Sequence, residues 1–276
     1  MIELAPGFSA QLPPGVDAFD YIMQLDGEVF RDIDNRRTLR FTLNDRRYFL
    51  KAHHGVGWGE ILKNLLQFRL PVLGARNEWC AIRRLQDLDV DTMALVGYGE
   101  RGLNPARRQS FVITEALEET VSLEEFCADW EKNPPATKAE LKFKRALIDK
   151  VAEVSRRLHE NGLNHRDYYI CHFLLDRSAV AMQAPLSAPR LSLIDLHRVQ
   201  LRRQTPPRWI VKDIGGLWFS SMRIGLTRRD IYRFMKGYKK KSLRDTLQDD
   251  GKFWSRCRLR AYSLYHSFYN ERPPAS

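Results

Sequence analysis

Hydrophobic and polar residues alternate in short runs over the first third of the chain, which is the spacing of β-strands. Thr38–Leu43 alternates in this way, Asn44–Asp45 supplies turn residues, and the apolar run Tyr48–Lys51 follows. This pattern predicts a β-hairpin. Two more strand-like runs, Met93–Tyr98 and Ser110–Thr114, predict that the hairpin belongs to a larger antiparallel sheet.

Helical spacing replaces this alternation in most of the remaining chain. Apolar residues in Trp58–Leu70 fall on one helical face, and a second helix is predicted over Arg76–Leu88. A long apolar stripe over Ala139–Asn161 predicts a third helix, with Gly162 as its C-terminal cap. Further helices are predicted between residues 209 and 270.

The order of these elements predicts an α+β protein with two lobes. Residues 1–24 read as a lead-in rich in proline and glycine, and residues 25–116 as a β-rich N-terminal lobe. Residues 117–276 then form a larger helical C-terminal lobe. Within it, residues 178–190 are rich in Ala, Ser and Pro, which predicts a surface insertion.

The net charge indicates which kinds of ligand the protein binds, and the cysteine content indicates its cellular compartment. The 276 residues include 45 Lys and Arg against 34 Asp and Glu, and the net charge of +11 favours anionic ligands. Because the basic residues are scattered and no RNA-binding motif is present, no nucleic-acid partner is expected. The four cysteines form no C-x-x-C pair, which fits a reducing cytoplasm. Neither a signal peptide nor a membrane-spanning run is predicted.

Polar residues with the chemistry of a kinase occur in a meaningful order. Lys51 ends a predicted strand, Glu78 lies on the next helix, the triplet His165–Asp167 follows the long helix, and Asp195 ends a short apolar strand. A kinase needs a lysine on the nucleotide phosphates and a glutamate that holds it. It also needs one aspartate that accepts the hydroxyl proton and another that binds Mg²⁺. The order predicts a protein-kinase-like fold that uses ATP and Mg²⁺.

Three departures from the protein-kinase pattern qualify this prediction. His172 stands where a kinase loop has the asparagine that binds a second Mg²⁺, so it either ligates metal or only hydrogen-bonds within the loop. No glycine-rich phosphate loop is present at Asp32–Arg37, which is either a plain polar turn or a site where arginines replace it by charge. No Ala-Pro-Glu follows Asp195, which favours a small-molecule or glycan acceptor over a peptide.

The segment Asn164–Leu175 closely resembles the catalytic loop of the lipopolysaccharide core heptose(I) kinases, the WaaP/RfaP family. His172 and the absent glycine-rich loop are features of that family too. The matching blocks run from about residue 27 to residue 240. The other blocks are Arg37–Phe41, Pro71–Ala75, Ile194–Arg198, Phe219–Met222 and Ile224–Thr227.

This resemblance implies transfer of phosphate from ATP to a hydroxyl of the first heptose in the lipopolysaccharide inner core. It implies that Asp167, in the triplet with His165 and Arg166, is the catalytic base. It also implies that Asp195 binds metal, with His172 as a second candidate ligand. Lys51 and Glu78 would anchor the nucleotide. Glu115 and Leu117 would contact the adenine at a hinge. The protein would work in the cytoplasm, at the inner face of the inner membrane of a Gram-negative bacterium.

Two questions stay open at this point. The apolar face of Trp58–Leu70 is either ordinary core or a grip for an acyl chain, carried by lipid A or by an acidic acyl carrier protein. The acceptor is the heptose of the lipopolysaccharide core, or else another core sugar such as Kdo. A nucleotide-binding pseudokinase that serves as a scaffold is the alternative outside the enzymes.

Overall fold

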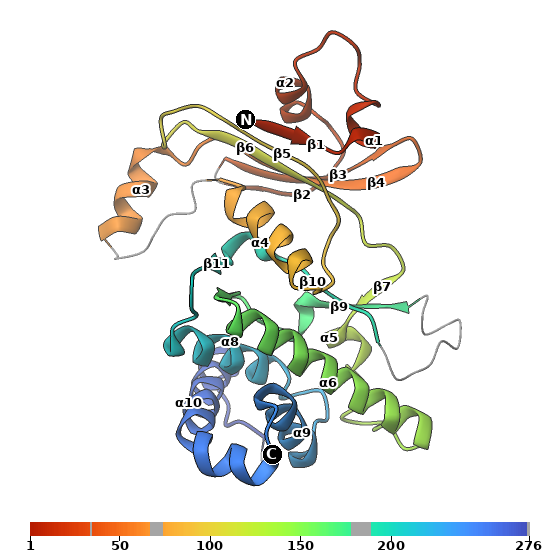
Figure 1. Cartoon of the computed structure of the whole chain (residues 1–276), viewed down its shortest axis with the longest axis vertical. Coiled ribbons are helices and arrows are strands. Elements are labelled where there is room, and N and C mark those ends of the chain that lie inside the picture. The colour runs from red at the N-terminus through yellow and green to blue at the C-terminus, as the bar shows by residue number, and fades with distance from the viewer. Residues whose placement is uncertain (34, 67–73, 178–188, 275–276) are drawn as a thin grey trace. The chain divides into compact units, whose positions relative to one another are not determined.

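The computed structural model describes residues 1–33, 35–66, 74–177 and 189–274, and the chain forms two compact units (Figure 1). The first unit contains the β-rich part and the second contains the helical part, so the predicted α+β class is confirmed. The first unit consists of Met1–Arg84, Met93–Leu117 and Leu196–Arg198, and the second of Leu85–Thr92, Glu118–Asp195 and Val199–Ser276.

The first unit is built on a six-stranded antiparallel sheet with the strand order β1-β5-β6-β4-β3-β2. The predicted hairpin is its β3–β4 pair, in which Asn44 and Asp45 take positive φ values of 47° and 60°. Such turn residues match the right-handed twist of the two strands. The strands are β1 (Ile2–Leu4), β2 (Glu28–Ile33), β3 (Arg36–Leu43), β4 (Arg46–His53), β5 (Leu95–Arg101) and β6 (Gln109–Glu115).

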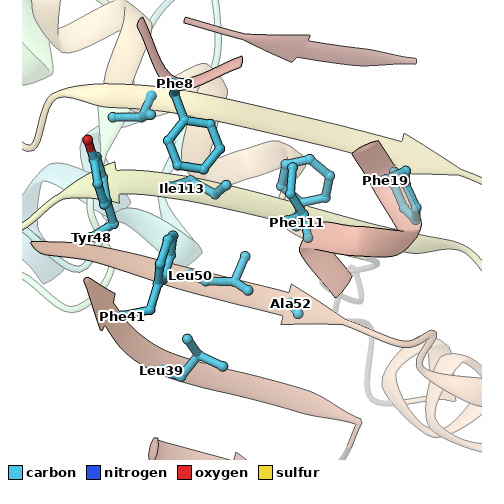
Figure 2. Close-up of a cluster of buried hydrophobic side chains, with 11 residues drawn as sticks. Phe8, Phe19, Leu39, Phe41, Tyr48, Leu50, Ala52, Phe111 and Ile113 are labelled. Atoms are coloured by element: carbon cyan, nitrogen blue, oxygen red, sulfur yellow. The ribbon is translucent and has the colours of Figure 1, made fainter. Parts of the chain in front are cut away.

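Alternate residues of β3, β4 and β6 form the core of the first unit on one face of the sheet (Figure 2). Leu50 faces Leu39 on one side and Ile113 on the other, and all three are almost completely buried. Each such side chain contributes about 1.5–3 kcal/mol through its removal from water. The labelled members of this core are Phe8, Phe19, Leu39, Phe41, Tyr48, Leu50, Ala52, Phe111 and Ile113.

Residues 1–24 contain more structure than the predicted lead-in. β1 pairs with β5, and the short helices α1 (Pro6–Ser9) and α2 (Ala18–Met23) follow it. Phe8 from α1 packs edge-on against the ring of Tyr48, with 5.4 Å between centroids. These residues therefore belong to the core of the first unit.

The two longer helices of the first unit, α3 and α4, differ in how far their apolar side chains are buried. α4 (Arg76–Asp87), close to the predicted bounds, buries Trp79 and Ile82. α3 (Gly57–Leu66) instead exposes three apolar side chains one turn apart, Trp58, Leu62 and Leu66, and buries Ile61. The interpretation of this face as ordinary core is wrong for those three residues. Residues 67–70 of the predicted helix lie outside the described part of the chain.

The second unit is mainly helical, and several of its helices begin where capping residues predict them. α6 starts at a capping box formed by Thr137 and Glu140, and Gly162 follows its end with φ of 81°. Capping boxes are also present at Ser122, before α5, and at Thr227, before α9. Its helices are α5 (Leu123–Phe126), α6 (Lys138–Glu160), α8 (Pro207–Ser220), α9 (Arg228–Lys239) and α10 (Leu243–Tyr269).

Short strands connect these helices. β9 (Phe173–Asp176) pairs with β7 (Thr120–Ser122) and with β10 (Leu191–Leu193), and β8 (Leu163–Asn164) pairs with β11 (Gln200–Leu201). The insertion predicted at 178–190 lies almost entirely outside the described residues. Among the helices that the structure describes, none is long and apolar enough to cross a membrane.

Close helix packing in the second unit depends on small residues of α8. A Cβ atom on Gly215 would lie 2.6 Å from the side chain of Arg260 on α10, and one on Gly216 would lie 3.1 Å from the carbonyl oxygen of Tyr168. Glycine at both positions therefore lets α8 approach α10 and the loop after β8. That loop carries the residues with predicted catalytic chemistry.

Candidate active site

Lys51 and Glu78 form an ion pair inside the first unit. Lys51 lies within β4, two residues before its end, and therefore not at the strand end as predicted. Its Nζ is 2.6 Å from Oε1 of Glu78, which lies on α4 and is only 2% exposed. The second carboxylate oxygen of Glu78, Oε2, is buried without a hydrogen-bond partner in the described structure. Because a buried carboxylate needs a compensating charge, Lys51 and Glu78 hold each other in place.

The predicted hinge coincides with the passage between the two units. Glu115 is the last residue of β6, and the amide of Ala116 donates to the carbonyl of Arg47 over 2.9 Å. The chain leaves the first unit after Leu117. Contact of Glu115 and Leu117 with adenine stays a prediction.

The loop after β8 is fixed by a buried carboxylate from α8. Oδ2 of Asp213 accepts a hydrogen bond from the amide of His165 at 2.6 Å, and Oδ1 accepts one from the amide of Arg166 at 2.9 Å. Asp213 is 1% exposed, and Arg166 takes the left-handed φ of 77°. Asp213 lies in the middle of α8 and not at its start, so its carboxylate anchors this loop and does not cap the helix.

His165 connects this loop to the segment that carries Asp195. The His165 ring is fully buried, and burial lowers the pKa of the imidazole, so the ring is neutral. Its Nε2 is 3.0 Å from the carbonyl oxygen of Ile194 and therefore carries the proton. In return, the amide of Ile194 donates to the carbonyl of His172 over 3.0 Å.

Asp195 lies two residues beyond a strand and does not end one as predicted. β10 stops at Leu193, whose amide donates to the carbonyl of Asp91 over 2.9 Å. Asp195 itself takes a left-handed φ of 59°, which turns the chain there. Among residues other than glycine, aspartate is one of the few that adopt this conformation readily, and the hydrogen bonds of the Ile194 amide and carbonyl hold it.

The His172 ring lies close to the backbone of Asp167 and to the side chain of Asp195. Its Nδ1 lies 2.7 Å from the carbonyl oxygen of Asp167, which can only accept, so Nδ1 carries the proton. Its Nε2 lies 3.6 Å from Oδ2 of Asp195. These two atoms are close enough to bind one cation together.

This donor set fits Mg²⁺. The ion prefers oxygen ligands and is usually held by one or two carboxylates together with waters and substrate phosphates. No cluster of three or more His, Cys, Asp or Glu side chains with metal-binding geometry occurs among the described residues. Asp195 with His172 would supply one carboxylate and one imidazole to such an ion, and the rest of the shell would come from water and phosphate.

Tyr168 is a packed residue of the loop and does not face a ligand. It is 1% exposed, and its hydroxyl lies 2.9 Å from Oγ of Ser155 on α6. Burial raises the pKa of this phenol far above its usual value. The Tyr168 ring is therefore not available to stack on a sugar.

The comparisons with known proteins agree with one another. The family described as "Lipopolysaccharide kinase (Kdo/WaaP) family" matches residues 20–238. The "Lipopolysaccharide core heptose(I) kinase WaaP" of Escherichia coli (strain K12) is 54% identical over 238 residues, which are 86% of this chain and 87% of the relative. A protein of that name from Pseudomonas aeruginosa PAO1 is 49% identical over 253 residues, which are 91% of each chain.

A solved structure is similar over almost the whole chain. It is described as "WaaP in complex with acyl carrier protein" and matches with a TM-score of 0.80 at 42% sequence identity. The match covers 96% of this chain and 99% of the other. Similarity of this extent places the sheet unit and the helical unit within one known fold.

Proposed function

This chain belongs to the lipopolysaccharide kinase (Kdo/WaaP) family, and from that premise we propose that it transfers the γ-phosphate of ATP to a hydroxyl of the first heptose in the lipopolysaccharide inner core. The resemblance stated from the sequence and the protein-kinase-like fold are confirmed. The observation that carries the proposal is the pairing of Lys51 with the buried Glu78, because a lysine held this way is the nucleotide anchor of kinases.

The residues of the chain take distinct parts in the proposed reaction. Lys51 neutralises charge on the nucleotide phosphates, and Glu78 keeps its ammonium group oriented. Asp167 accepts the proton of the acceptor hydroxyl as that oxygen attacks the γ-phosphorus. Asp195 and His172 would hold Mg²⁺, which supplies positive charge to the phosphates when bound. Asp213 and His165 position the loop and do not touch the reacting atoms.

The ion pair gives the first testable prediction. Lys51→Met is expected to weaken Mg·ATP binding by about tenfold or more, because a charge-assisted contact to the phosphates is lost. Glu78→Gln should have a smaller effect in the same direction, since the neutral amide no longer fixes the ammonium group. Titration calorimetry with Mg·ATP measures both. Lys132→Met removes the same charge from an exposed position and should bind as the wild type does; equal affinity in all four proteins would refute the role of the pair.

The acceptor is tested by direct comparison. Wild-type protein with labelled ATP and Mg²⁺ should phosphorylate dephosphorylated core that contains heptose. It should leave core truncated to Kdo unmodified. Phosphorylation of the Kdo core alone would shift the function to the other core sugar, and ATP binding with transfer to neither would favour the pseudokinase.

We also propose that the chain associates with an acyl carrier protein, because the similar solved structure is described as a complex with one. The supporting observation is an apolar cavity of about 100 Å³ within the second unit, between α6, α8, α9 and α10. Its walls include Leu147, Leu217 and Phe234, and an acyl chain matches such walls. The apolar residues of α3 are exposed, whereas several helices line this cavity, so it suits an acyl chain better.

Filling the cavity tests this partner. Leu226→Trp adds a ring at the cavity wall and is expected to weaken binding of acylated carrier protein by about tenfold, because the displaced chain loses its apolar burial. Binding of unacylated carrier protein should not change. Leu259→Trp adds the same ring at an exposed site of α10 and serves as the control. Equal affinity of the wild type for both forms of the carrier would overturn the assignment.

The place of action follows from the proposed substrate. A core oligosaccharide attached to lipid A is presented at a membrane surface, and we propose that this protein acts in the cytoplasm at the inner face of the inner membrane. The exposed stripe of Trp58, Leu62 and Leu66 on α3 supports contact with that surface. Cell fractionation that recovers the protein only apart from membranes would contradict the peripheral contact.

A further inference from the structure

Four cationic side chains surround the indole ring of Trp209 on α8 in the second unit. Nζ of Lys212 lies 4.3 Å from the ring centroid. The guanidinium carbons of Arg166, Arg208 and Arg202 lie 5.5, 5.6 and 5.7 Å from it. The four charges therefore fall within 5.7 Å of a single point, the centre of the indole ring. We call these five residues the Trp209 cluster.

Two of these cations have no carboxylate partner in the described part of the chain. Arg202 donates to Oδ1 of Asn164 and to Oε1 of Gln200, and both acceptors are neutral amides. Arg208 is exposed and forms no ion pair with any described residue. Burial, together with the nearby charge of Arg208, lowers the pKa of Arg202. The protein thus concentrates positive charge here, and no described carboxylate pairs with either of these two arginines.

The indole nitrogen of Trp209 adds an unused donor. Its Nε1 is buried and has no hydrogen-bond acceptor among the described residues. A buried N–H without an acceptor is destabilising. Cation–π contacts with the ring stabilise each cation, whereas the crowded cations repel one another. An oxyanion would pair with the guanidinium and ammonium groups and so relieve the repulsion among the four cations.

The position of the cluster ties it to the proposed reaction. Arg166 directly precedes Asp167, and its amide is fixed by Asp213 of the same helix that carries Arg208 and Lys212. An anion bound by the cluster would therefore lie next to the loop of the catalytic base. A catalytic loop flanked by such charge favours an acceptor that itself carries negative groups.

We propose that the Trp209 cluster is an acceptor subsite that binds an oxyanion, either a carboxylate or a phosphate, carried by the core oligosaccharide near the hydroxyl to be phosphorylated. This inference rests on the proposed function, because it presumes a saccharide acceptor. It adds four residues outside the kinase motif to substrate recognition: Arg202, Arg208, Trp209 and Lys212. The cluster would then select for acidic core acceptors over neutral sugars.

Calorimetric titration without nucleotide tests the subsite apart from catalysis. The probes are purified core oligosaccharide, the same oligosaccharide with its carboxyl groups reduced to alcohols, and a dephosphorylated preparation. Arg208→Gln and Lys212→Gln should each weaken binding of untreated oligosaccharide by about tenfold, the size expected for a lost charge-assisted bond. Arg244→Gln removes an equal charge from an exposed site of α10 and should leave the affinity unchanged.

The modified probes identify which anion is bound. Removal of the bound group, carboxylate or phosphate, should abolish the difference between variant and wild type, and Arg208→Lys should restore part of the affinity. The proposal is overturned if wild type does not bind the oligosaccharide, if the variants bind as wild type does, or if their loss persists on probes lacking each anion. Oligosaccharide that binds through the cluster but is never phosphorylated would refute the kinase function and leave the subsite standing.

Discussion

Replacing Asp167 by asparagine is expected to lower kcat by about 10²- to 10⁴-fold, the usual contribution of a general base. The amide has nearly the same shape but cannot accept the hydroxyl proton. The backbone carbonyl of residue 167 would still receive the hydrogen bond from His172, so the loop should keep its form. Steady-state kinetics with heptose-containing core should show the loss in kcat, with little change in KM for ATP.

A matched variant separates this chemical effect from a loss of charge. Asp249→Asn removes a carboxylate from an exposed position on α10, where it pairs with Lys241, and should leave kcat unchanged. If Asp167→Asn retained activity within a few fold of wild type, Asp167 would not be the base. The proton would then have to leave by another route.

Asp213→Asn is expected to destabilise the second unit by about 1–3 kcal/mol and to lower activity as well. Asparagine has one acceptor oxygen where Asp213 uses two, and its NH₂ group would face one of the two backbone N–H groups. A buried donor left without an acceptor accounts for that loss of stability. Arg166 would lose the support for its left-handed φ, and the adjacent Asp167 would lose its position.

Denaturant unfolding followed by kinetics checks this second prediction. The comparison variant is Asp149→Asn on α6, whose carboxylate forms a half-exposed ion pair with Arg233 and should contribute about 0–1 kcal/mol. The prediction is contradicted if the two variants have the same free energy of unfolding and Asp213→Asn keeps full activity. The buried carboxylate would then not organise the loop.

Local signals in the sequence predict much of this fold. The β3–β4 hairpin needs only alternation and two turn residues, and both are adjacent in sequence. The bounds of α6 come within one residue of the prediction, because the helix carries its own apolar stripe, capping box and terminal glycine. Such features are decided within a few residues of the chain.

The structure of residues 1–24 depends on distant partners and was not predictable in this way. β1 has three residues and becomes a strand only because β5, some 95 positions later, provides its hydrogen-bond partners. The same limit applies to α3. Its apolar stripe has the helical spacing of a core helix, yet Trp58, Leu62 and Leu66 are exposed. Periodicity reveals an apolar face but does not identify what covers it.

Part of the candidate site could likewise be predicted from the sequence, and part of it could not. The order of Lys51, Glu78, Asp167 and Asp195 indicates their roles, but the burial of Glu78 follows only from its pairing with β4. Four members of the Trp209 cluster lie within residues 202–212, but Arg166 comes from the catalytic loop, so the sequence did not show that the four cations meet at one ring. A carboxylate beside two glycines in the apolar run of α8 is the signal that marks Asp213.

The most direct measurement is the mass and linkage of the core oligosaccharide after incubation with pure protein, ATP and Mg²⁺. Wild-type protein should add one phosphate group to the first heptose of dephosphorylated core. Asp167→Asn, at equal concentration and over the same time, should leave nearly all of it unmodified. Unmodified core in the wild-type reaction, under conditions where calorimetry shows that ATP is bound, would contradict phosphoryl transfer to this sugar.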